Sequence, residues 1–566
     1  MRPGTRWQHR TAVRALAVTA AAGLALSACS GGSSTATGDT TGGATDGASD
    51  ATFIFGGSAD PITLDGAYVS DGESLRAIQQ IFEGLVTSKP GTTEVIPNLA
   101  ESWTTSPDGK TWTFKLKSGV TFTDGTAFDA AAVCTNFDRW YNFKGLQQSS
   151  SISYYWTTVF GGFAKNEDDS LPPSLYSKCE ATDATTATIT LTKASSTFLS
   201  ALSLPSFFIA SPKALTEFKA DEVSGTADAP VFSGTFGSEH PIGTGPFKLA
   251  KWEKGNQLVL ERNDAYWGAK AKIKTLVLKP IADGPARRQA LEAGDIDGYD
   301  LVDPSDVQAL KDGGYEILNR PAFNVAYVGF NQAIKPLDNP KVREAVAYAL
   351  NRENVIKTNY PEGAQVATQF MPPEVFGYAQ DVPTYAYDPA KAKALLAEAG
   401  VPNPTVEFWY PTDVSRPYMP NPEANYQLFK KDLEAVGFKV TTKSAPWNPD
   451  YLNQVDAGKA AIYLLGWTGD FGDPDNFIGT FFQSKQLAWG YDNKDLQALL
   501  DKAEAETDLA KRTADYEEAS KVIMTDLPGV PYAHTQPSLA FKAGVTGFVP
   551  SPTSSELFTD VTVPAK

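Results

Sequence analysis

Hydrophobic and polar residues alternate along several short stretches of the chain. Residues 112–116 (Trp-Thr-Phe-Lys-Leu) and 189–191 (Ile-Thr-Leu) place a hydrophobic side chain at every second position. This period of two predicts strands that bury one face. The stretch 461–466 (Ala-Ile-Tyr-Leu-Leu-Gly) is apolar and has the length of a buried strand, and a loop rich in Gly, Asp and Pro follows it.

Other stretches carry the signals of helices. Asn339-Pro340 and Asp388-Pro389 each combine an N-cap residue with proline at the first helical position, and Gly400 ends the second of these helices. The period of 3.6 residues predicts further helices over 424–436, 495–506 and 511–526. Helices and strands that mix without a fixed repeat predict an α/β fold with more than one lobe.

Length and charge narrow the class of protein. The chain has 566 residues, which at about 100 to 200 residues per domain corresponds to several domains. Its 49 Lys and Arg residues against 66 Asp and Glu residues give a formal net charge of −17. Nucleic-acid binding depends on clustered positive charge that neutralises phosphates, so we do not expect this acidic chain to bind nucleic acid.

Residues that commonly perform catalysis or hold metals are scarce. The three histidines (His9, His240 and His534) and the three cysteines lie far apart, so the sequence contains no Cys/His zinc pattern. The motifs GxSxG, GxxxxGK[ST] and GxGxxG are also absent, and Pro246 interrupts the nearest match. We therefore expect no catalytic residue, no metal and no cofactor.

The first thirty residues have the pattern of an export signal. Four arginines in the first 14 residues precede an apolar stretch, 15–28, which is shorter than the roughly 20 residues that span a bilayer. Residues 1–28 are therefore predicted to be a signal peptide. Leu26-Ser-Ala-Cys29 resembles a bacterial lipobox, which predicts a lipid on Cys29; the alternative is an ordinary signal peptide with a chance cysteine. Residues 29–50 are predicted to be the lipidated cysteine and a flexible linker.

The predicted export places the rest of the chain outside the cytoplasm, anchored to the cell membrane by its N-terminal lipid. From Cys29 onward, 45 basic against 66 acidic residues leave a net charge of −21, and no stretch has 18 consecutive apolar residues. The lipid is therefore expected to be the only contact with the membrane. Because oxidising compartments permit disulfides, Cys134 and Cys179 are predicted to form one, with two buried free thiols as the alternative.

Several motifs together resemble one family, the bacterial extracellular solute-binding proteins of family 5, which serve peptide-type ABC importers. These motifs lie at 97–103, 106–125, 243–247, 263–267 and 331–352. The resemblance implies a periplasmic-binding-protein-like class II α/β fold that is three-lobed, with two halves closing about a hinge. It implies domain I at 51–95, 235–315 and 530–566, domain II at 96–234 and domain III at 316–529.

The same resemblance implies a function and its partners. The expected protein is a monomeric receptor that captures di- or oligopeptides and delivers them to an ABC permease and its ATPase, without catalysing a reaction. Ligand capture would act by biasing the protein towards a closed form that the permease recognises.

Within the family, the last lobe most resembles the dipeptide-binding proteins. The stretches 416–421 (Arg-Pro-Tyr-Met-Pro-Asn) and 466–477, together with Trp447, follow the pattern of that group. By this match Arg416 would hold the α-carboxylate of the peptide and Asp470 its α-amino group, with Trp447, Tyr418 and Trp467 beside the ligand. A guanidinium fork and a carboxylate suit a ligand with one charge of each sign.

Some alternatives stay open. The interval from Arg416 to Asp470 is one residue longer than the dipeptide group leads us to expect, so the length of the preferred peptide is undecided. Eleven tryptophans also suit an oligosaccharide, other family members take nickel complexes or haem, and an exported hydrolase with two carboxylates or a signalling receptor would fit the composition. Asp473, Asp475 and Asn476 resemble a calcium loop only weakly, because the twelfth position is Ser484, so turn and helix capping is the preferred interpretation.

Overall fold

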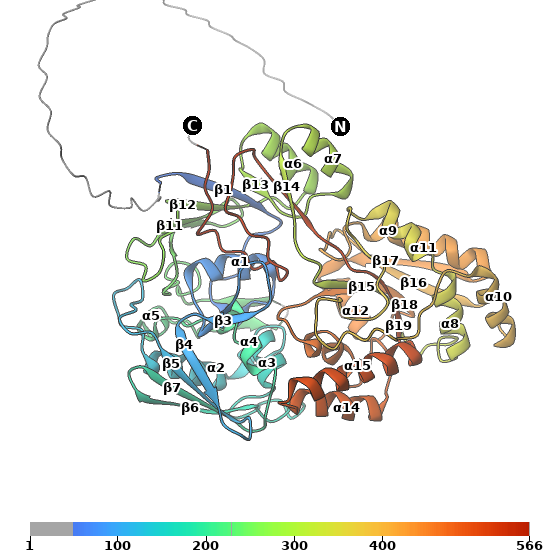
Figure 1. Cartoon of the computed structure of the whole chain (residues 1–566), viewed down its shortest axis with the longest axis horizontal. Helices are drawn as coiled ribbons and strands as arrows, with labels where there is room; N and C mark the ends of the chain where they lie inside the picture. The colour runs from blue at the N-terminus through green and yellow to red at the C-terminus, as the bar shows by residue number, and fades with distance from the viewer. Residues whose placement is uncertain (1–48, 228, 565–566) are drawn as a thin grey trace, which may run out of the picture. The chain divides into compact units, whose positions relative to one another are not determined.

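The computed structural model describes residues 49–227 and 229–564 (Figure 1). The predicted signal peptide, Cys29 and nearly all of the predicted linker therefore lie outside the described residues. Three larger sheets and two hairpins organise the described part. The hairpins are β2–β3 (Val86–Ser88, Val95–Pro97) and β8–β9 (Val223–Thr226, Ala229–Phe232). No helix in the described ranges is long and apolar enough to cross a membrane.

A seven-stranded sheet takes its strands from three separate parts of the chain. Its order is β10 (Phe247–Glu253), β11 (Gln257–Arg262), β12 (Thr275–Pro280), β1 (Thr52–Gly57), β13 (Gly298–Tyr299), β20 (Ser538–Phe541) and β14 (Glu316–Asn319). Phe53 and Phe55 of β1 are fully buried and pack against Phe541 of β20 and Phe558 near the C-terminus. Helices α1 (Gly72–Ile81), α6 (Gly284–Ala293) and α7 (Val307–Asp312) belong to the same part of the fold.

The second of the larger sheets has four antiparallel strands. Its order is β4 (Ala100–Thr105), β5 (Thr111–Leu116), β7 (Thr186–Leu191) and β6 (Tyr176–Asp183). Strands β5 and β7 cover the two alternating stretches of the sequence, so that prediction is confirmed. The helices of this part are α2 (Ala130–Tyr141), α3 (Tyr154–Phe160), α4 (Phe198–Ala201) and α5 (Pro212–Glu217).

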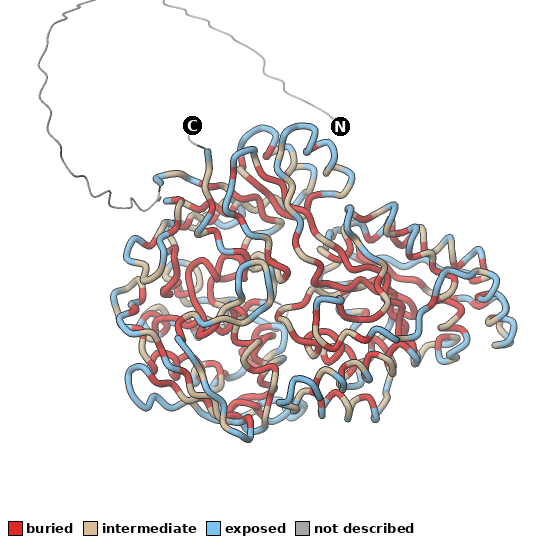
Figure 2. Tube along the Cα trace, in the orientation of Figure 1, coloured by how far each residue is buried: buried red, intermediate tan, exposed pale blue. Residues whose placement is uncertain are grey.

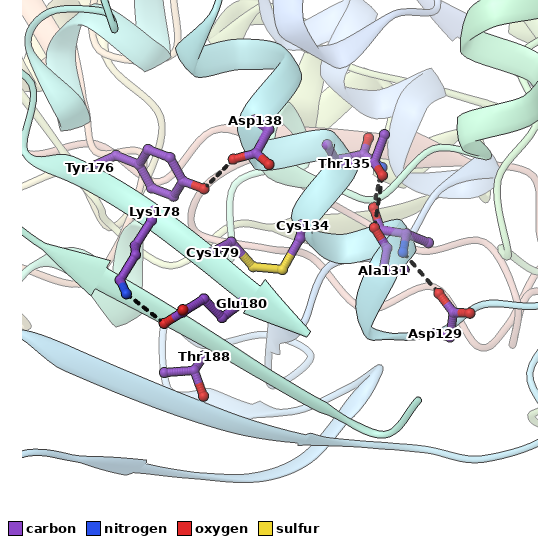
Figure 3. Close-up of a disulfide and its surroundings, with 12 residues drawn as sticks. Asp129, Ala131, Cys134, Thr135, Asp138, Tyr176, Lys178, Cys179, Glu180 and Thr188 are labelled. Carbon is purple, nitrogen blue, oxygen red and sulfur yellow. Dashed lines mark hydrogen bonds and ion pairs between the residues drawn. A yellow bond between two sulfur atoms is a disulfide. The ribbon is translucent and has the colours of Figure 1, made fainter. Parts of the chain in front are cut away.

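A disulfide joins helix α2 to strand β6 of this sheet. Cys134 lies on α2 and Cys179 on β6, and their Sγ atoms are bonded at 2.00 Å (Figure 3). One turn further along the helix, Asp138 accepts a hydrogen bond of 2.7 Å from the Tyr176 hydroxyl. The helix is thus fixed to the sheet by a covalent bond and a polar contact.

The third sheet has five strands and lies in the second half of the chain. Its order is β17 (Lys439–Pro446), β16 (Thr405–Thr412), β18 (Ile462–Thr468), β15 (Asn324–Phe330) and β19 (Gly529–Ala533). Strands β15 and β19 are buried along their whole length and form part of the interior that Figure 2 colours red. Strand β18 covers 462–466 of the apolar stretch 461–466 that the sequence predicts as a strand.

The helices around this sheet begin at the caps that the sequence indicates. Helix α8 (Pro340–Ala349) is capped by Asn339 and α10 (Pro389–Glu398) by Asp388. Helices α11 (Pro422–Val436) and α15 (Leu509–Asp526) each start two residues before the predicted position, because Asn421 and Asp508 cap them. The remaining helices are α9 (Arg352–Asn359), α12 (Leu452–Asp456), α13 (Ile478–Phe482) and α14 (Lys494–Ala505).

Two chain segments cross between the first and the third sheet, and they are hydrogen-bonded to each other. Arg320 N donates to Pro537 O at 2.9 Å, and Asn324 Oδ1 accepts from Thr535 N at 2.9 Å. The Arg320 guanidinium is buried and pairs with Asp300 and Glu556, each at 2.6 Å. The crossovers are therefore held by paired charges as well as by backbone contacts.

These crossovers place two strands differently from the domain boundaries expected from the sequence. Strand β14 lies after the boundary at 315 but pairs with β20 in the first sheet, and β19 spans the boundary at 530 but pairs with β15 in the third. A hydrogen-bonding partner decides which sheet a strand joins, and the sequence pattern does not reveal that partner. The division into three lobes otherwise stays a prediction.

Candidate functional site

The Arg416 side chain lies over an aromatic ring. Its Cζ atom is 4.4 Å from the centre of the Trp447 ring, and Trp447 in turn stacks on Tyr451 at 6.2 Å. The Arg416 side chain makes no hydrogen bond to any residue of the described ranges, and its Nε atom is buried. A cation–π contact holds a guanidinium without using its N–H donors. Arg416 is therefore positioned with its donors free for an anion.

The loop that carries Arg416 is fixed on strand β18. Arg416 and Met419 exchange backbone hydrogen bonds of 3.1 and 2.9 Å. Tyr418 between them is buried against Gly466, where a Cβ atom would lie 2.3 Å from the tyrosine ring. Burial raises the pKa of Tyr418 to about 12, although the nearby Arg416 acts in the opposite direction. Tyr418 is therefore neutral and anchors the loop through its ring.

Asp470 follows the end of β18 in a tightly packed turn. A Cβ atom at Gly469 would lie 2.3 Å from the ring of Phe323, so a larger side chain cannot precede Asp470 without displacing its neighbours. Asp470 N donates to Asn476 Oδ1 at 2.6 Å, and Asn476 Nδ2 donates to Asp470 Oδ2 at 3.2 Å. Trp467 Nε1 reaches the same Asn476 oxygen at 3.5 Å. Trp467 thus acts on Asp470 through Asn476.

Helix α3 supplies a further hydrogen-bond donor to Asp470. The hydroxyl of Tyr155, on α3, donates to Asp470 Oδ1 at 2.8 Å. Burial raises the pKa of Asp470 to about 6, while the hydrogen bonds from Tyr155 and Asn476 lower it. Asp470 forms no ion pair with any residue that the structure describes. The carboxylate therefore lacks a counter-ion, and an ammonium group would stabilise its ionised form.

Tyr155 was not predicted from the sequence. It lies 315 positions before Asp470 and belongs to a Tyr-Tyr-Trp stretch with no motif around it. Only the packing of α3 against the loop after β18 reveals the contact. The same loop carries Phe471, which is buried within the core of the first two sheets.

Arg416 and Asp470 line different cavities. Arg416 borders a cavity of about 320 Å³ beside the stretch 301–306 and the crossover at Pro537. Asp470 borders a cavity of about 250 Å³ together with Glu83 of the first part and residues of the C-terminal segment. The structure thus brings Arg416 together with Trp447 and Tyr418, and Asp470 together with Trp467, and strand β18 joins the two groups.

The acidic stretch after Asp470 has a structural role. Asp473 caps the short 3-10 helix 474–476 by accepting from Asp475 N at 2.9 Å. Its carboxylate also accepts from both terminal nitrogens of Arg512, at 2.6 and 2.8 Å. The first contact agrees with the capping interpretation that the sequence favours, and the second is an ion pair.

Comparison with known proteins identifies the family. The family model for bacterial extracellular solute-binding proteins, family 5 Middle, matches residues 94–489. The chain belongs to this family. Its members bind solutes, and the periplasmic-binding-protein-like fold expected from the sequence motifs is confirmed by the solved structures that this chain resembles.

Individual relatives of this family-5 chain are named for different ligands. The dipeptide-binding protein of Escherichia coli (strain K12) is 33% identical over 500 residues, covering 85% of this chain and 89% of the relative. Heme-binding protein A of Haemophilus influenzae is 30% identical over 561 residues, covering 98% of this chain and 100% of the relative. The structure of the ABC transporter-associated periplasmic binding protein DppA from Helicobacter pylori in complex with peptide STSA has a TM-score of 0.74 at 27% identity, covering 90% of this chain and 98% of that chain.

Proposed function

We propose that this protein is an extracytoplasmic receptor that captures di- or oligopeptides and passes them to an ABC permease and its ATPase. The observation that carries the proposal is a pair of opposite charges at β18: Arg416 lies in a loop packed on this strand, and Asp470 follows its end. Arg416 keeps its hydrogen-bond donors free, and Asp470 has no cation among the described residues. A peptide with free termini supplies the missing partner for each.

In the proposed site, neighbouring side chains hold each of the two charged residues in place. Arg416, held by Trp447, would bind the α-carboxylate, and Asp470, held by Tyr155 and Asn476, would bind the α-ammonium. Tyr418 and Trp467 position these two residues. Burial disfavours the ionised form of Asp470, so a ligand that brings no cation to this carboxylate is expected to bind more weakly.

The proposed delivery depends on the N-terminal lipid and on a closing movement of the fold. The signal peptide and the lipid on Cys29 would retain a monomeric receptor at the outer face of the cell membrane. Two halves, one built on the first two sheets and one on the third, would close over the peptide by bending at the paired crossovers. The closed form would then be the one that the permease binds.

Isothermal titration of the full chain tests the proposed ligand. We expect a dipeptide such as Ala-Phe to bind one to one, and N-acetylation of the dipeptide or Asp470→Ala to abolish binding. A tetrapeptide that binds more tightly would assign the chain to longer peptides. Binding of haem or of a cello-oligosaccharide, with none of the peptides binding, would overturn the proposal.

A further inference from the structure

The cavity beside Asp470 has an acidic lining. Glu83, Glu556 and Asp560 border it together with Asp470, and Lys89 is the basic residue among those that line it. Lys89 is more than half exposed and pairs with Glu94 at 3.0 Å. The positive charge of Lys89 is thus already paired at the protein surface. Asp560 is likewise exposed and pairs with Lys272 at 3.2 Å, so the buried carboxylates of the lining are Glu83 and Glu556.

Glu83 is a buried carboxylate whose hydrogen-bond donors are all neutral groups. Only 5% of its surface is exposed, and it forms no ion pair with any residue in 49–227 or 229–564. Its oxygens accept from the Tyr266 hydroxyl at 2.7 Å, Trp267 Nε1 at 2.7 Å and the Thr244 hydroxyl at 2.8 Å. All three donors are neutral. Burial raises the pKa of Glu83, whereas these hydrogen bonds and the nearby Lys117 cation lower it.

Glu556 adds a second buried carboxylate with spare capacity. Its Oε1 atom accepts from Arg320 at 2.6 Å, but its Oε2 atom is buried and has no hydrogen-bond partner within the described part of the chain. A carboxylate oxygen that is desolvated and unpartnered gains from any donor that reaches it. The Oε2 atom of Glu556 therefore indicates a place for a hydrogen-bond donor, whatever the number of acidic residues in the lining.

The rest of the lining suits an aliphatic chain. Phe82, Phe208, Val549 and Leu557 also border the cavity, and Val549 and Leu557 are exposed at the protein surface. Lysine and arginine side chains place an apolar stem against such surfaces and keep a charged head among polar groups. The cavity of about 250 Å³ therefore combines apolar walls with anionic groups.

We propose that this cavity takes a basic side chain, that of lysine or arginine, from the first residue of the bound peptide. The inference rests on the proposed peptide function, because the α-ammonium of the same residue pairs with Asp470. The side-chain cation then lies with Glu83, the carboxylate whose hydrogen-bond donors are all neutral. Peptides with a basic first residue are thus the preferred class of ligand.

Titration of the full chain with matched dipeptides tests this preference. We expect Lys-Ala to bind at least about tenfold more tightly than norleucyl-alanine, which keeps the stem without the charge. Ala-Lys is expected to bind no more tightly than Ala-Ala. Equal or weaker binding of Lys-Ala than of norleucyl-alanine overturns the inference while leaving the proposed function intact. Failure of every dipeptide, Ala-Ala included, overturns both.

A variant of Glu83 tests whether the preference for a basic first residue arises in this cavity. Glu83→Gln keeps the shape of the side chain, and we expect it to remove the advantage of Lys-Ala while norleucyl-alanine retains its affinity within about threefold. Glu180→Gln, which removes an exposed carboxylate paired with Lys178, is the control and should keep the advantage. If Glu83→Gln retains the advantage, the cation lies elsewhere and the inference is wrong. The wild-type comparison does not depend on whether this variant folds.

Discussion

The hydroxyl of Tyr155 donates a hydrogen bond of 2.8 Å to Asp470 Oδ1 across 315 positions of sequence. Tyr155 lies on helix α3 and Asp470 in the loop after β18, and the acceptor is the carboxylate to which we assign the peptide amino group. The contact therefore couples the proposed ligand site to the packing of α3. It also favours the ionised form of Asp470, because the hydrogen bond is made to the charged oxygen.

Removal of this donor is expected to raise the pKa of Asp470. In Tyr155→Phe, the pH at which peptide binding falls to half should move upward by roughly one unit, because a hydrogen bond to a charged group is lost. Titration calorimetry between pH 5 and pH 8 measures the shift. Tyr154→Phe, at the neighbouring position, is the control and should leave the midpoint unchanged. An unchanged midpoint in Tyr155→Phe would show that its hydroxyl does not act on Asp470.

Peptide binding should weaken in mild acid. The pKa of Asp470 in the free protein is raised to about 6, so the carboxylate is ionised above that pH and neutral below it. The α-ammonium of a peptide stays protonated throughout this range and needs the ionised carboxylate. Affinity should therefore fall by about tenfold per pH unit below pH 6. Asp470→Asn should bind weakly at every pH, and a steep acid loss in that variant would assign the titration to another group.

The stacking of Arg416 on Trp447 predicts that lysine cannot replace the arginine. Arg416→Lys keeps the charge but loses the planar fork and most of the ring contact, so affinity for a dipeptide should drop at least about tenfold. Trp447→Leu should lower affinity less, since the guanidinium remains. Affinity of Arg416→Lys equal to that of the wild type would mean that the α-carboxylate is held by other donors.

The buried pairs of Arg320 predict a large loss of stability on its removal. Arg320→Met leaves Asp300 and Glu556 without this partner, and truncation of a buried ion pair typically costs about 3 to 5 kcal/mol of the free energy of unfolding. Denaturant unfolding measures the loss. Lys178→Met removes an exposed pair with Glu180 and should cost under about 1 kcal/mol. Similar losses in the two variants would show that the buried pairs contribute little.

The sequence predicts local structure well where the signal is local. Asn339 and Asp388 cap the helices expected of them, and residues 112–116 form a strand, because capping and alternation act within a few positions. Contacts of high sequence separation were not predictable in this way. Tyr155 at Asp470 is one example, and the pairing of β14 with β20 rather than with the third sheet is another.

The candidate site, too, could be predicted only in part from the sequence. Motifs pointed to Arg416, Trp447 and Asp470, and the structure gives Arg416 a ring to lie on and Asp470 neutral donors. The motifs gave no sign that these two charges border separate cavities, since cavity walls are built from loops that meet only after folding. Glu83 likewise carries no signal in the sequence, because its burial and its hydrogen-bond donors Thr244 and Tyr266 depend on residues far away along the chain.

The seven-stranded sheet requires both ends of the chain. Strand β13 lies between β1 and β20, and Phe558 packs on Phe55, so the hydrophobic core around β1 stays incomplete until nearly all of the polypeptide has emerged from the ribosome. Late closure of such long-range contacts slows folding. A nascent chain therefore cannot complete this sheet before its C-terminal segment has been synthesised.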